Sequence, residues 1–363
     1  MAAWFERSRS IGDPGRIHGE GMTARVEIEE ARSTIASFFG ARSREVVFTS
    51  GATESIASAV WGAAPRGTQI LVPAIEHSAV REAAGALVEA GTHEVVSIGV
   101  DGAGRVDPAA IVDALTPATA LVNLQWANHE VGTRQPVAEV VAACRAREVL
   151  VHIDAAAAAG HDPIDFRALD ADLMSIAGHK FGGPPGIGVL LVRRGVRLRS
   201  LLRGGDQERA RRAGLENTPA ILGLAAACAA LDPARLEDEA ARQRSLTDRI
   251  VHAVRTKGTL AGVHVYGHVD DRAPHIVCLG IDGIEPQAVL LGLDQAGVAA
   301  HSGSACSSEA LEPSPVLEAM GVDAHRSLRL SVGWSSTDAD IDALLSALPI
   351  TIARLRALGA ATD

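Results

Sequence analysis

Lys180 is the first residue of this sequence whose type and surroundings indicate chemistry. The chain has 363 residues and only two lysines, Lys180 and Lys257, because its other cationic side chains are arginines. Lys180 stands in "SIAGHKFGGPPGIGVLLVRR", directly after a histidine and before a glycine-rich stretch. A lysine that is shielded from water loses its proton more readily and can then form a Schiff base with a carbonyl compound. The simpler alternative is a solvated surface lysine.

Two further motifs match the needs of one cofactor, pyridoxal 5′-phosphate (PLP). This cofactor requires a lysine, an acid that faces its pyridinium nitrogen and a cradle for its phosphate. Asp154, which ends the apolar run "VLVHID", is the predicted acid. The stretch "SGATES" is the predicted cradle, because Gly51 allows close approach of the backbone and Thr53 offers a hydroxyl. The helix that follows would direct free N–H groups at an anion. Each feature alone is typical of an ordinary turn, so the prediction depends on their combination.

Cys306 is a candidate nucleophile because its surroundings differ from those of the other three cysteines. It lies in "AHSGSACSSEALEPSP", among small and polar residues. Cys144, Cys228 and Cys278 lie in apolar stretches and are predicted to be buried, as most free cysteines are. A thiol on a Gly/Ser-rich loop is predicted to be exposed and able to travel.

Short apolar runs alternate with segments of helical periodicity in the first two thirds of the chain. This alternation predicts an α/β fold with a mainly parallel sheet covered by helices on both faces. Polar residues after the strands then meet at one edge of the sheet, where such folds bind ligands. The predicted strands are "EVVFTS", "QILVPA", "TALVNLQWA", "VLVHIDA" and "ADLMSIAG". We predict a large domain over residues 1–235 and a smaller C-terminal α/β domain over 236–363, with the cysteine loop at about 300–312.

Composition excludes several classes of protein. The chain is 47% hydrophobic, with a net charge of −10 and no basic block, which argues against a nucleic-acid partner. No apolar run approaches the ~20 residues that span a bilayer, and the N-terminus lacks the apolar core of a secretory signal. Widely spaced cysteines predict free thiols in a reducing cytoplasm and no metal site.

The motifs together resemble the cysteine desulfurases of the NifS/IscS type, in the class V aminotransferase family of fold-type I PLP enzymes. The resemblance runs from about residue 11 to residue 334, and "GHKFGGPPGIG" with "SGSACSS" is its most specific part. It implies conversion of L-cysteine to L-alanine by a PLP-dependent homodimer that passes sulfur to an acceptor protein. Its other matching segments are "FTSGATES", "IEHSAV", "WANHEVGT", "HIDAAAAAG", "GGDQERARRAG" and "SLRLSVG".

The resemblance also implies a role for each site residue. Lys180 binds PLP covalently and moves the Cα proton, while Cys306 attacks the substrate sulfur and becomes a persulfide. His77 stacks on the ring and acts as an acid or base. The remaining implied contacts are Asp154 with the ring nitrogen, Ala52, Thr53 and His179 with the phosphate, Asn128 and His129 with the substrate, and Arg329 with the substrate carboxylate.

The sequence departs from the family pattern at four polar positions. His129 stands where the family has a second Asn, and we predict that it donates to the phenolic oxygen of PLP instead. Ala157, Ala177 and Leu215 replace a Gln, a Ser and a Thr that contact the cofactor in the family. The usual opening "LDNAATTP" is also missing. Two alternatives stay open. A selenocysteine lyase or other PLP-dependent C–S lyase would use the same cofactor but would not need Cys306 in the same way. The lost contacts and the missing opening instead allow a non-catalytic homologue that acts as a sulfur-relay scaffold.

Overall fold

The computed structural model describes residues 1–7, 12–256, 260–302 and 313–359. The chain groups into two compact units, each of which has its own sheet. The first unit contains Met1–Ile98, Pro108–Trp126 and Pro136–Leu236. The second contains Gly99–Asp107, Ala127–Gln135 and Glu237–Asp363. Residues 99–107 and 127–135 therefore belong with the C-terminal part of the chain, although they precede residue 235.

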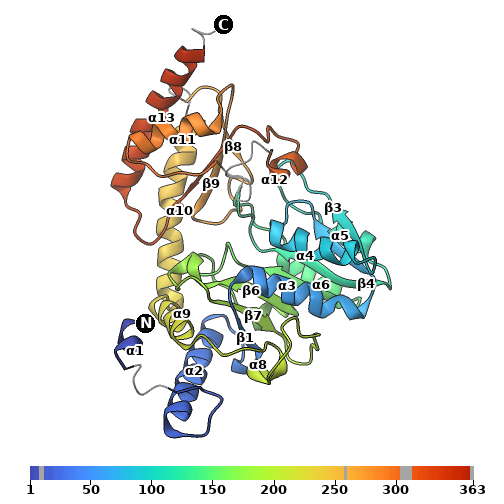
Figure 1. Cartoon of the computed structure of the whole chain (residues 1–363). Helices are drawn as coiled ribbons and strands as arrows, with labels where there is room; N and C mark the ends of the chain where they lie inside the picture. Colours follow the sequence, from blue (N-terminus) through green and yellow to red (C-terminus); the bar gives the residue numbers. More distant parts are fainter. Residues whose placement is uncertain (8–11, 257–259, 303–312, 360–363) are drawn as a thin grey trace. The chain divides into compact units, whose positions relative to one another are not determined.

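The first unit is built on a seven-stranded sheet with the order β1-β7-β6-β5-β4-β2-β3 (Figure 1). Strands β6, β5, β4, β2 and β3 run parallel, while β7 runs antiparallel to both β6 and β1. The strands are β1 (Val46–Thr49), β2 (Gln69–Pro73), β3 (Glu94–Ile98), β4 (Thr119–Gln125), β5 (Leu150–Asp154), β6 (Leu173–Ala177) and β7 (Gly188–Val192).

Helices separate these strands in the chain, as the alternating pattern of the sequence predicts. The α-helices are α1 (Ala2–Arg7), α2 (Gly19–Phe38), α3 (Ala52–Ala63), α4 (Ser78–Glu89), α5 (Pro108–Ala114), α6 (Val137–Arg145), α7 (Phe166–Leu169), α8 (Gln207–Ala210) and α9 (Thr218–Ala230). The described residues also form the short 3₁₀ helices η2 (Ser43–Glu45), η3 (Ala64–Arg66) and η4 (Gly178–Phe181).

The core of the first unit forms because its central strands are apolar along their whole length. Every residue of β4, β5 and β6 is buried, which is typical of parallel strands covered on both faces. Helix α3 contacts β5, β6 and β7, and α6 contacts β4 and β5. Helices α2 and α9 pack side by side (Figure 1). This rigid frame fixes the positions of the loops that follow the strands.

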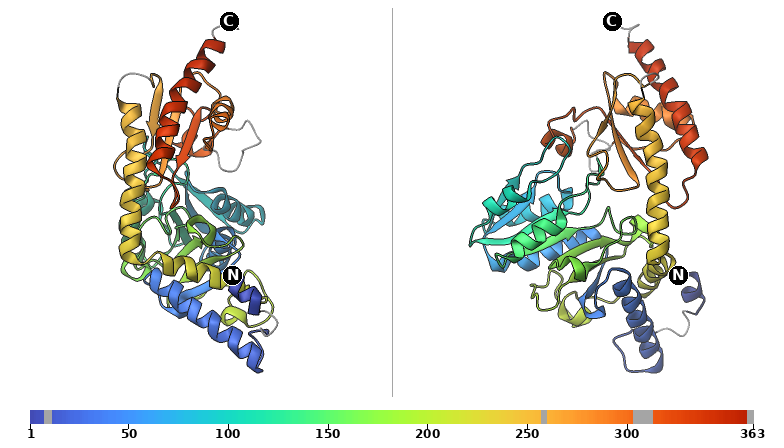
Figure 2. Two further views of the ribbon diagram at one scale, coloured as in Figure 1. Left: turned by 90° about the vertical axis from the view of Figure 1, so that its left-hand side faces the viewer. Right: turned by 180° about the vertical axis from the view of Figure 1, so that it is seen from behind.

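The second unit is built on a three-stranded antiparallel sheet with the order β10-β9-β8 (Figure 2). Its strands are β8 (Val263–Tyr266), β9 (Ile276–Ile281) and β10 (Ser327–Ser331). Its helices are α10 (Pro233–Arg255), whose first turn belongs to the first unit, α11 (Pro286–Gln295), α12 (Pro315–Ala319) and α13 (Asp338–Gly359). Helices α11 and α13 pack on each other, and β9 and β10 contribute buried apolar side chains to one core.

The predicted α/β fold class is confirmed, and each of the five predicted strands of the first unit is present. Strands β3, β7 and β8 were not predicted. Among the described residues, no single helix is long and apolar enough to span a membrane, and only the bent pair α9 with α10 passes that test by length and composition.

Candidate active site

The sheet of the first unit brings the ends of several strands to one edge. Because β7 is antiparallel to both β1 and β6, β1 runs in the same direction as β6. Thr49 and Ala177 both pair with Gly188, so the carboxyl ends of β1 and β6 lie level across β7. On the other side of β6, Asp154 of β5 pairs with Ser175. The loops after β1, β2, β5 and β6, which carry the predicted cofactor residues, therefore start from the same edge.

The loop after β1 fits a phosphate. Helix α3 begins after Gly51, and its N-terminus has no capping hydrogen bond from a side chain of the described residues. A Cβ built on Gly51 would meet no atom within 4 Å, so there is open space beside this turn. Uncapped N–H groups at the start of a helix attract an anion. The exposed Thr53 lies in this first turn, next to Ala52.

The carboxylate of Glu54 is hydrogen-bonded to this turn and to Arg212. It accepts hydrogen bonds from the backbone N–H of Ser50 (2.8 Å) and from the Arg212 guanidinium (2.8 and 3.2 Å). Burial alone would raise the pKa of Glu54, but the bonds from Arg212 and Ser50 lower it. The motif "GGDQERARRAG" therefore contributes one arginine that stabilises the loop between β1 and α3.

Asp154 lies where the sequence predicts the acid that faces the cofactor ring. It is the last residue of β5, is 7% exposed, and accepts a hydrogen bond on Oδ1 from the backbone N–H of Ala156 (2.9 Å). Two residues earlier, His152 is fully buried and contacts Asn123 Oδ1 (3.0 Å) and Ser175 Oγ (2.8 Å). Burial lowers the pKa of His152 to about 3, so this histidine is neutral and links β4, β5 and β6.

Lys180 follows β6 in the 3₁₀ helix η4, and its side chain is exposed. Its backbone carbonyl contacts His161 Nε2 at 3.2 Å. Gly160, with φ +79°, lets this segment approach η4, because a Cβ there would lie 2.1 Å from Cβ of Phe181. The chain that follows Asp154 therefore supports the turn that carries Lys180. The pKa of the neighbouring His179 is lowered, by burial first and by the charge of Lys180 second.

His77 begins helix α4, and its Nδ1 accepts a hydrogen bond from the backbone N–H of Ala79 (3.1 Å). The residue before it, Glu76, was not singled out from the sequence. Its side chain is fully buried, and Oε1 accepts a hydrogen bond from the backbone N–H of Gln125 at the end of β4 (2.8 Å). Burial raises the pKa of Glu76 to about 8, and the charge of Asp154 adds to this effect.

The second unit holds the predicted substrate-binding residues together. Arg329 lies on β10 opposite Cys278 and donates from Nη1 to the backbone carbonyl of His129 (3.1 Å). Asn128 is buried, and its Oδ1 accepts hydrogen bonds from the backbone N–H groups of Glu130 and Val131 (2.8 Å each). The Asn128 amide oxygen thus fixes the turn that presents the His129 carbonyl to Arg329.

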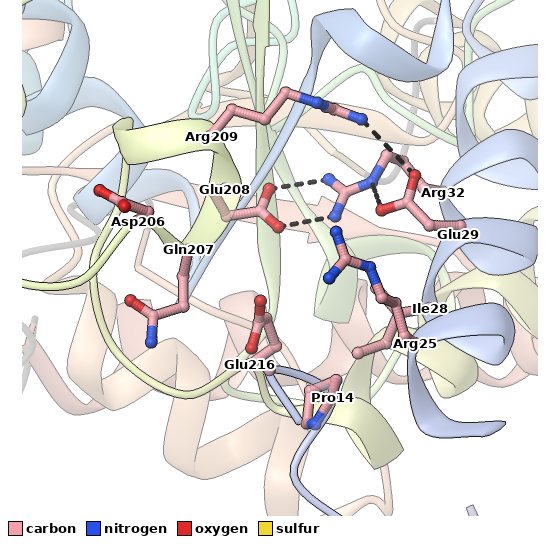
Figure 3. Close-up of a pocket in the computed structure, with 11 residues that line it drawn as sticks. Pro14, Arg25, Ile28, Glu29, Arg32, Asp206, Gln207, Glu208, Arg209 and Glu216 are labelled. Carbon is pink, nitrogen blue, oxygen red and sulfur yellow. Dashed lines mark hydrogen bonds and ion pairs between the residues drawn. The ribbon is translucent and has the colours of Figure 1, made fainter. Parts of the chain in front are cut away.

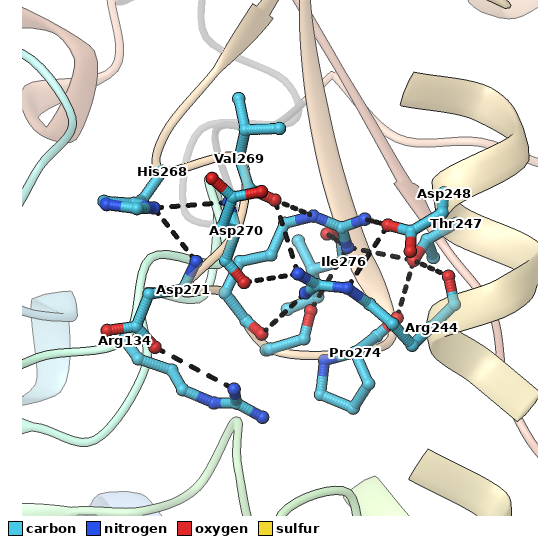
Figure 4. A network of polar contacts seen from close by, with 12 residues as sticks. Arg134, Arg244, Thr247, Asp248, His268, Val269, Asp270, Asp271, Pro274 and Ile276 are labelled. Atoms are coloured by element: carbon cyan, nitrogen blue, oxygen red, sulfur yellow. Dashed lines mark hydrogen bonds and ion pairs between the residues drawn. The ribbon is translucent and has the colours of Figure 1, made fainter. Parts of the chain in front are cut away.

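A network of arginines and aspartates fastens segment 127–135 to the loop before β9 (Figure 4). The backbone N–H of Arg134 donates to the Asp271 carbonyl (3.1 Å), and the Asp271 backbone N–H donates to His268 Nδ1 (2.9 Å). Arg272, 1% exposed, bonds to Asp248 (2.6 Å) and so ties this loop to α10. The position of Asn128–Glu130 is therefore determined within the second unit.

Cys306, the predicted nucleophile, lies outside the described residues. The prediction that Cys144, Cys228 and Cys278 are buried is confirmed. Burial raises the pKa of Cys144 and of Cys228 to about 12, which keeps both thiols protonated at neutral pH. The pKa of Cys278 is raised as well, for the same reason.

A cavity of about 550 Å³ in the first unit is lined in part by residues with unusual backbone conformation (Figure 3). Glu208, Arg209 and Ala210 all have positive φ, and Glu208 forms a two-bond ion pair with the buried Arg32 (2.7 and 2.8 Å). Glu208 also accepts from the backbone N–H of Phe48 (2.9 Å). The bonds of Glu208 therefore pair it with Arg32 and Phe48, and the predicted site residues do not line this cavity.

Comparison with known proteins agrees with this geometry. Residues 6–344 match the family model described as Aminotransferase class-V. A cysteine desulfurase of Gluconacetobacter diazotrophicus is 40% identical over 96% of this chain and 88% of that protein. An IscS-like cysteine desulfurase of Mycobacterium tuberculosis is 42% identical, over 96% and 91% of the two chains. A solved NifS-like protein superposes with a TM-score of 0.89 at 30% identity, covering 98% of this chain and 94% of the other. The resemblance inferred from the motifs is confirmed: the chain belongs to the aminotransferase class-V family, among its cysteine desulfurases of the NifS/IscS type.

Proposed function

We propose that this protein converts L-cysteine to L-alanine with the aid of PLP and collects the sulfur on Cys306. The observation that carries the proposal is the common edge of the first unit. An uncapped helix N-terminus, Asp154 and Lys180 follow strands whose carboxyl ends lie at that edge. Membership of the cysteine desulfurase group supports the reaction.

The residues present fit PLP. The first turn of α3, with Ala52 and Thr53, would hold the phosphate together with His179, and Asp154 would face the ring nitrogen. When bound, PLP withdraws electrons from the bonds at Cα of an amino acid joined to it. Lys180 would bind the cofactor through Nζ, and its amine would take and return the Cα proton of the substrate. His77 lies after the neighbouring strand β2 and would exchange protons beside the ring.

Two residues of the second unit would act on the substrate itself. Arg329 would pair with the substrate carboxylate through its planar guanidinium. The Cys306 thiolate would attack the substrate sulfur, forming an S–S bond as the Cβ–S bond breaks. The electron pair of that bond stays on Cβ and takes up a proton, so the products are L-alanine and a persulfide on Cys306. An acceptor protein would then remove the outer sulfur atom.

The departures from the family pattern weaken cofactor binding without removing it. Each missing neutral hydrogen bond costs about 0.5–1.5 kcal/mol. Ala157, Ala177 and Leu215 together therefore cost about 1.5–4.5 kcal/mol of PLP binding, because His129 is expected to replace the donor lost at its own position. Covalent attachment at Lys180 and the charge of Asp154 compensate for this loss. We therefore expect PLP to be retained, but with lower affinity than in relatives that keep all four groups.

The test is to incubate the purified, PLP-loaded protein with L-cysteine and to assay alanine and sulfide. Mass spectrometry of Cys306 should show the added mass of one sulfur atom. Lys180→Ala should remove the visible absorbance band of the cofactor, whereas Lys257→Ala, at the only other lysine, should keep it. Cys306→Ala should keep the band but reduce sulfide release to background.

Each alternative predicts a different result in the same assay. Full turnover of L-cysteine by Cys306→Ala would contradict the persulfide route and favour another C–S lyase. Failure of the wild-type protein to develop a visible band with added PLP would contradict catalysis altogether and favour a scaffold.

A further inference from the structure

Glu130 is a buried carboxylate that the proposed reaction leaves without a role. It lies in the second unit, two residues after Asn128, and is 3% exposed. Its Oε2 accepts a hydrogen bond from Ser314 Oγ (2.6 Å), and its Oε1 lies 3.6 Å from Nε2 of His129. A buried charge of this kind persists only where other groups compensate for its lost hydration.

One compensating group is the guanidinium of Arg329. Burial lowers the pKa of Arg329, and the negative charge of Glu130 opposes that effect. The guanidinium also bonds to the carbonyl of His129, the residue directly before Glu130 (3.1 Å). Because Asn128 Oδ1 receives the Glu130 backbone N–H, the carbonyl and the carboxylate are fixed by one turn. The turn that carries Glu130 therefore also holds the carbonyl to which Arg329 bonds.

The other compensating group is the hydroxyl of Ser314, which lies eight residues after Cys306 in the sequence. Ser314 caps helix α12 by accepting the Leu317 backbone N–H (3.2 Å), and its own backbone N–H donates to the Ala324 carbonyl (3.1 Å). On the other side of Cys306 in the sequence, His301 exchanges two backbone hydrogen bonds with Arg329 (2.7 and 3.2 Å). The described residues before and after Cys306 are thus bound to Arg329 and to Glu130 respectively.

We propose that Glu130 is a positioning residue that orients Arg329 for the substrate carboxylate and, through Ser314, anchors the chain after Cys306. The inference rests on the proposed function, in which Arg329 pairs with that carboxylate. One buried side chain then serves both the alignment of the substrate and the anchoring of Ser314. These two duties are separable, because the charge acts on Arg329 and the hydrogen bond acts on Ser314.

The first test is Glu130→Gln, which removes the charge but keeps an oxygen that accepts from Ser314. Binding to the PLP-loaded protein is followed by the change in visible absorbance with two probes, L-alanine and ethylamine. Ethylamine has the amino group but no carboxylate. We expect the dissociation constant of L-alanine to rise about tenfold and that of ethylamine to stay within twofold. Glu318→Gln, at an exposed position of α12, is the matched control and should change neither.

The second test is Ser314→Ala, which keeps the charge and removes the anchor. We expect L-alanine binding and KM for L-cysteine to stay within twofold, while kcat for sulfide release falls several-fold. Glu130→Asp, which keeps the charge on a shorter side chain, should retain L-alanine affinity within about threefold. Asp therefore rescues the binding defect of Gln, and the Ser314→Ala arm still tests the anchor if Glu130→Gln does not fold.

Three outcomes would overturn the inference. In the first, Glu130→Gln binds L-alanine as well as or better than the wild type. In the second, Glu130→Gln weakens the binding of ethylamine as much as that of L-alanine, which indicates general damage to the site. In the third, Ser314→Ala weakens the binding of L-alanine as much as Glu130→Gln does. If the wild-type protein responds to neither amine, the proposed function itself fails, and that result is distinct from these three.

Discussion

At the scale of residues, the edge of the large sheet carries two carboxyl groups of different character. Asp154 accepts a backbone hydrogen bond at the end of β5. Glu76 is fully buried, and its Oε2 has no hydrogen-bond partner among the described residues. Burial raises the pKa of Glu76 to about 8, with Asp154 as the second cause and Arg81 acting in the opposite direction. With a pKa of about 8, Glu76 is protonated and therefore neutral at pH 7.

Glu76→Gln should change the pH dependence of stability. The pKa of Glu76 is about 8 in the folded chain, compared with an ordinary value of 4.5. The contribution of Glu76 to the free energy of unfolding is therefore fully present below pH 4.5 and is lost as the pH rises through 8. Between pH 6 and pH 9 the wild type should therefore lose about 2–3 kcal/mol of unfolding free energy relative to Glu76→Gln. Urea unfolding of the PLP-loaded protein at both pH values measures this. Parallel profiles for the two proteins would refute it, and Glu82→Gln, exposed on α4, is the control.

The sequence predicted residues whose motifs are distinctive and missed those whose role depends on burial. Lys180 and Asp154 follow neighbouring strands, as their place after apolar runs predicts. Glu76 and Glu130 stand beside His77 and the turn at Asn128, yet nothing in their spacing indicates that both are buried. Burial of a charged side chain results from long-range packing, which a single sequence does not display.

At the scale of elements, the contact between β7 and the loop after β1 shapes the predicted phosphate cradle. Gly188 begins β7 and pairs with Thr49 and Ala177. A Cβ at position 188 would lie 2.6 Å from backbone atoms of Gly51 and 2.8 Å from the Ile176 carbonyl. The turn that starts α3 can therefore take its place only because this residue is glycine.

Gly188→Ala should displace the start of α3. Because the clash is with backbone atoms, we expect a loss of about 1–3 kcal/mol of unfolding free energy and weaker PLP binding. Urea unfolding and titration of the apoprotein with PLP, followed by absorbance, measure both effects. Gly85→Ala is the matched control, because a Cβ there meets nothing within 4 Å and the position lies inside α4. That variant should be neutral or up to about 1 kcal/mol more stable. Equal stability of the two variants would contradict the argument.

The buried parallel strands were predictable because their residues are apolar without interruption. Strand β7 was not predicted, because "GVLLV" is a short run that directly follows a glycine-rich motif. Strand β3 lies at an end of the sheet, and most of its residues are exposed, so it lacks a strong apolar pattern. An antiparallel strand inside a mainly parallel sheet likewise has no local signature.

At the scale of the whole molecule, the chain passes between its two units several times. Segments 99–107 and 127–135 complete the second unit from a distant part of the sequence. An ion pair joins Arg105 to Asp271, and the Thr133 hydroxyl accepts the backbone N–H of His268 (2.9 Å). Sequence order alone predicts a boundary near residue 235 and does not reveal these two returns. The predicted homodimer, acceptor protein and cytoplasmic location stay predictions.

A fragment of residues 237–363 should not fold by itself. It lacks both segments, so Ser314 and Asp271 lose the partners that Glu130 and Arg105 provide. We expect a broad, non-cooperative change on urea unfolding, monitored by circular dichroism, where the full chain shows a sharp transition. A cooperative transition of the isolated fragment would show that the two segments are dispensable. Joining residues 99–107 and 127–135 to the fragment through flexible linkers should restore cooperativity.

The dependence of segment 127–135 on the loop before β9 has a consequence for synthesis on the ribosome. Thr133 and His268 are 135 residues apart, so the earlier partner emerges on the order of ten seconds before the later one at ordinary translation rates. During that interval the nascent chain exposes the turn at Asn128 and the polar groups that it later pairs. Neither unit can close before most of the polypeptide has been made, and chaperones are expected to engage this chain co-translationally.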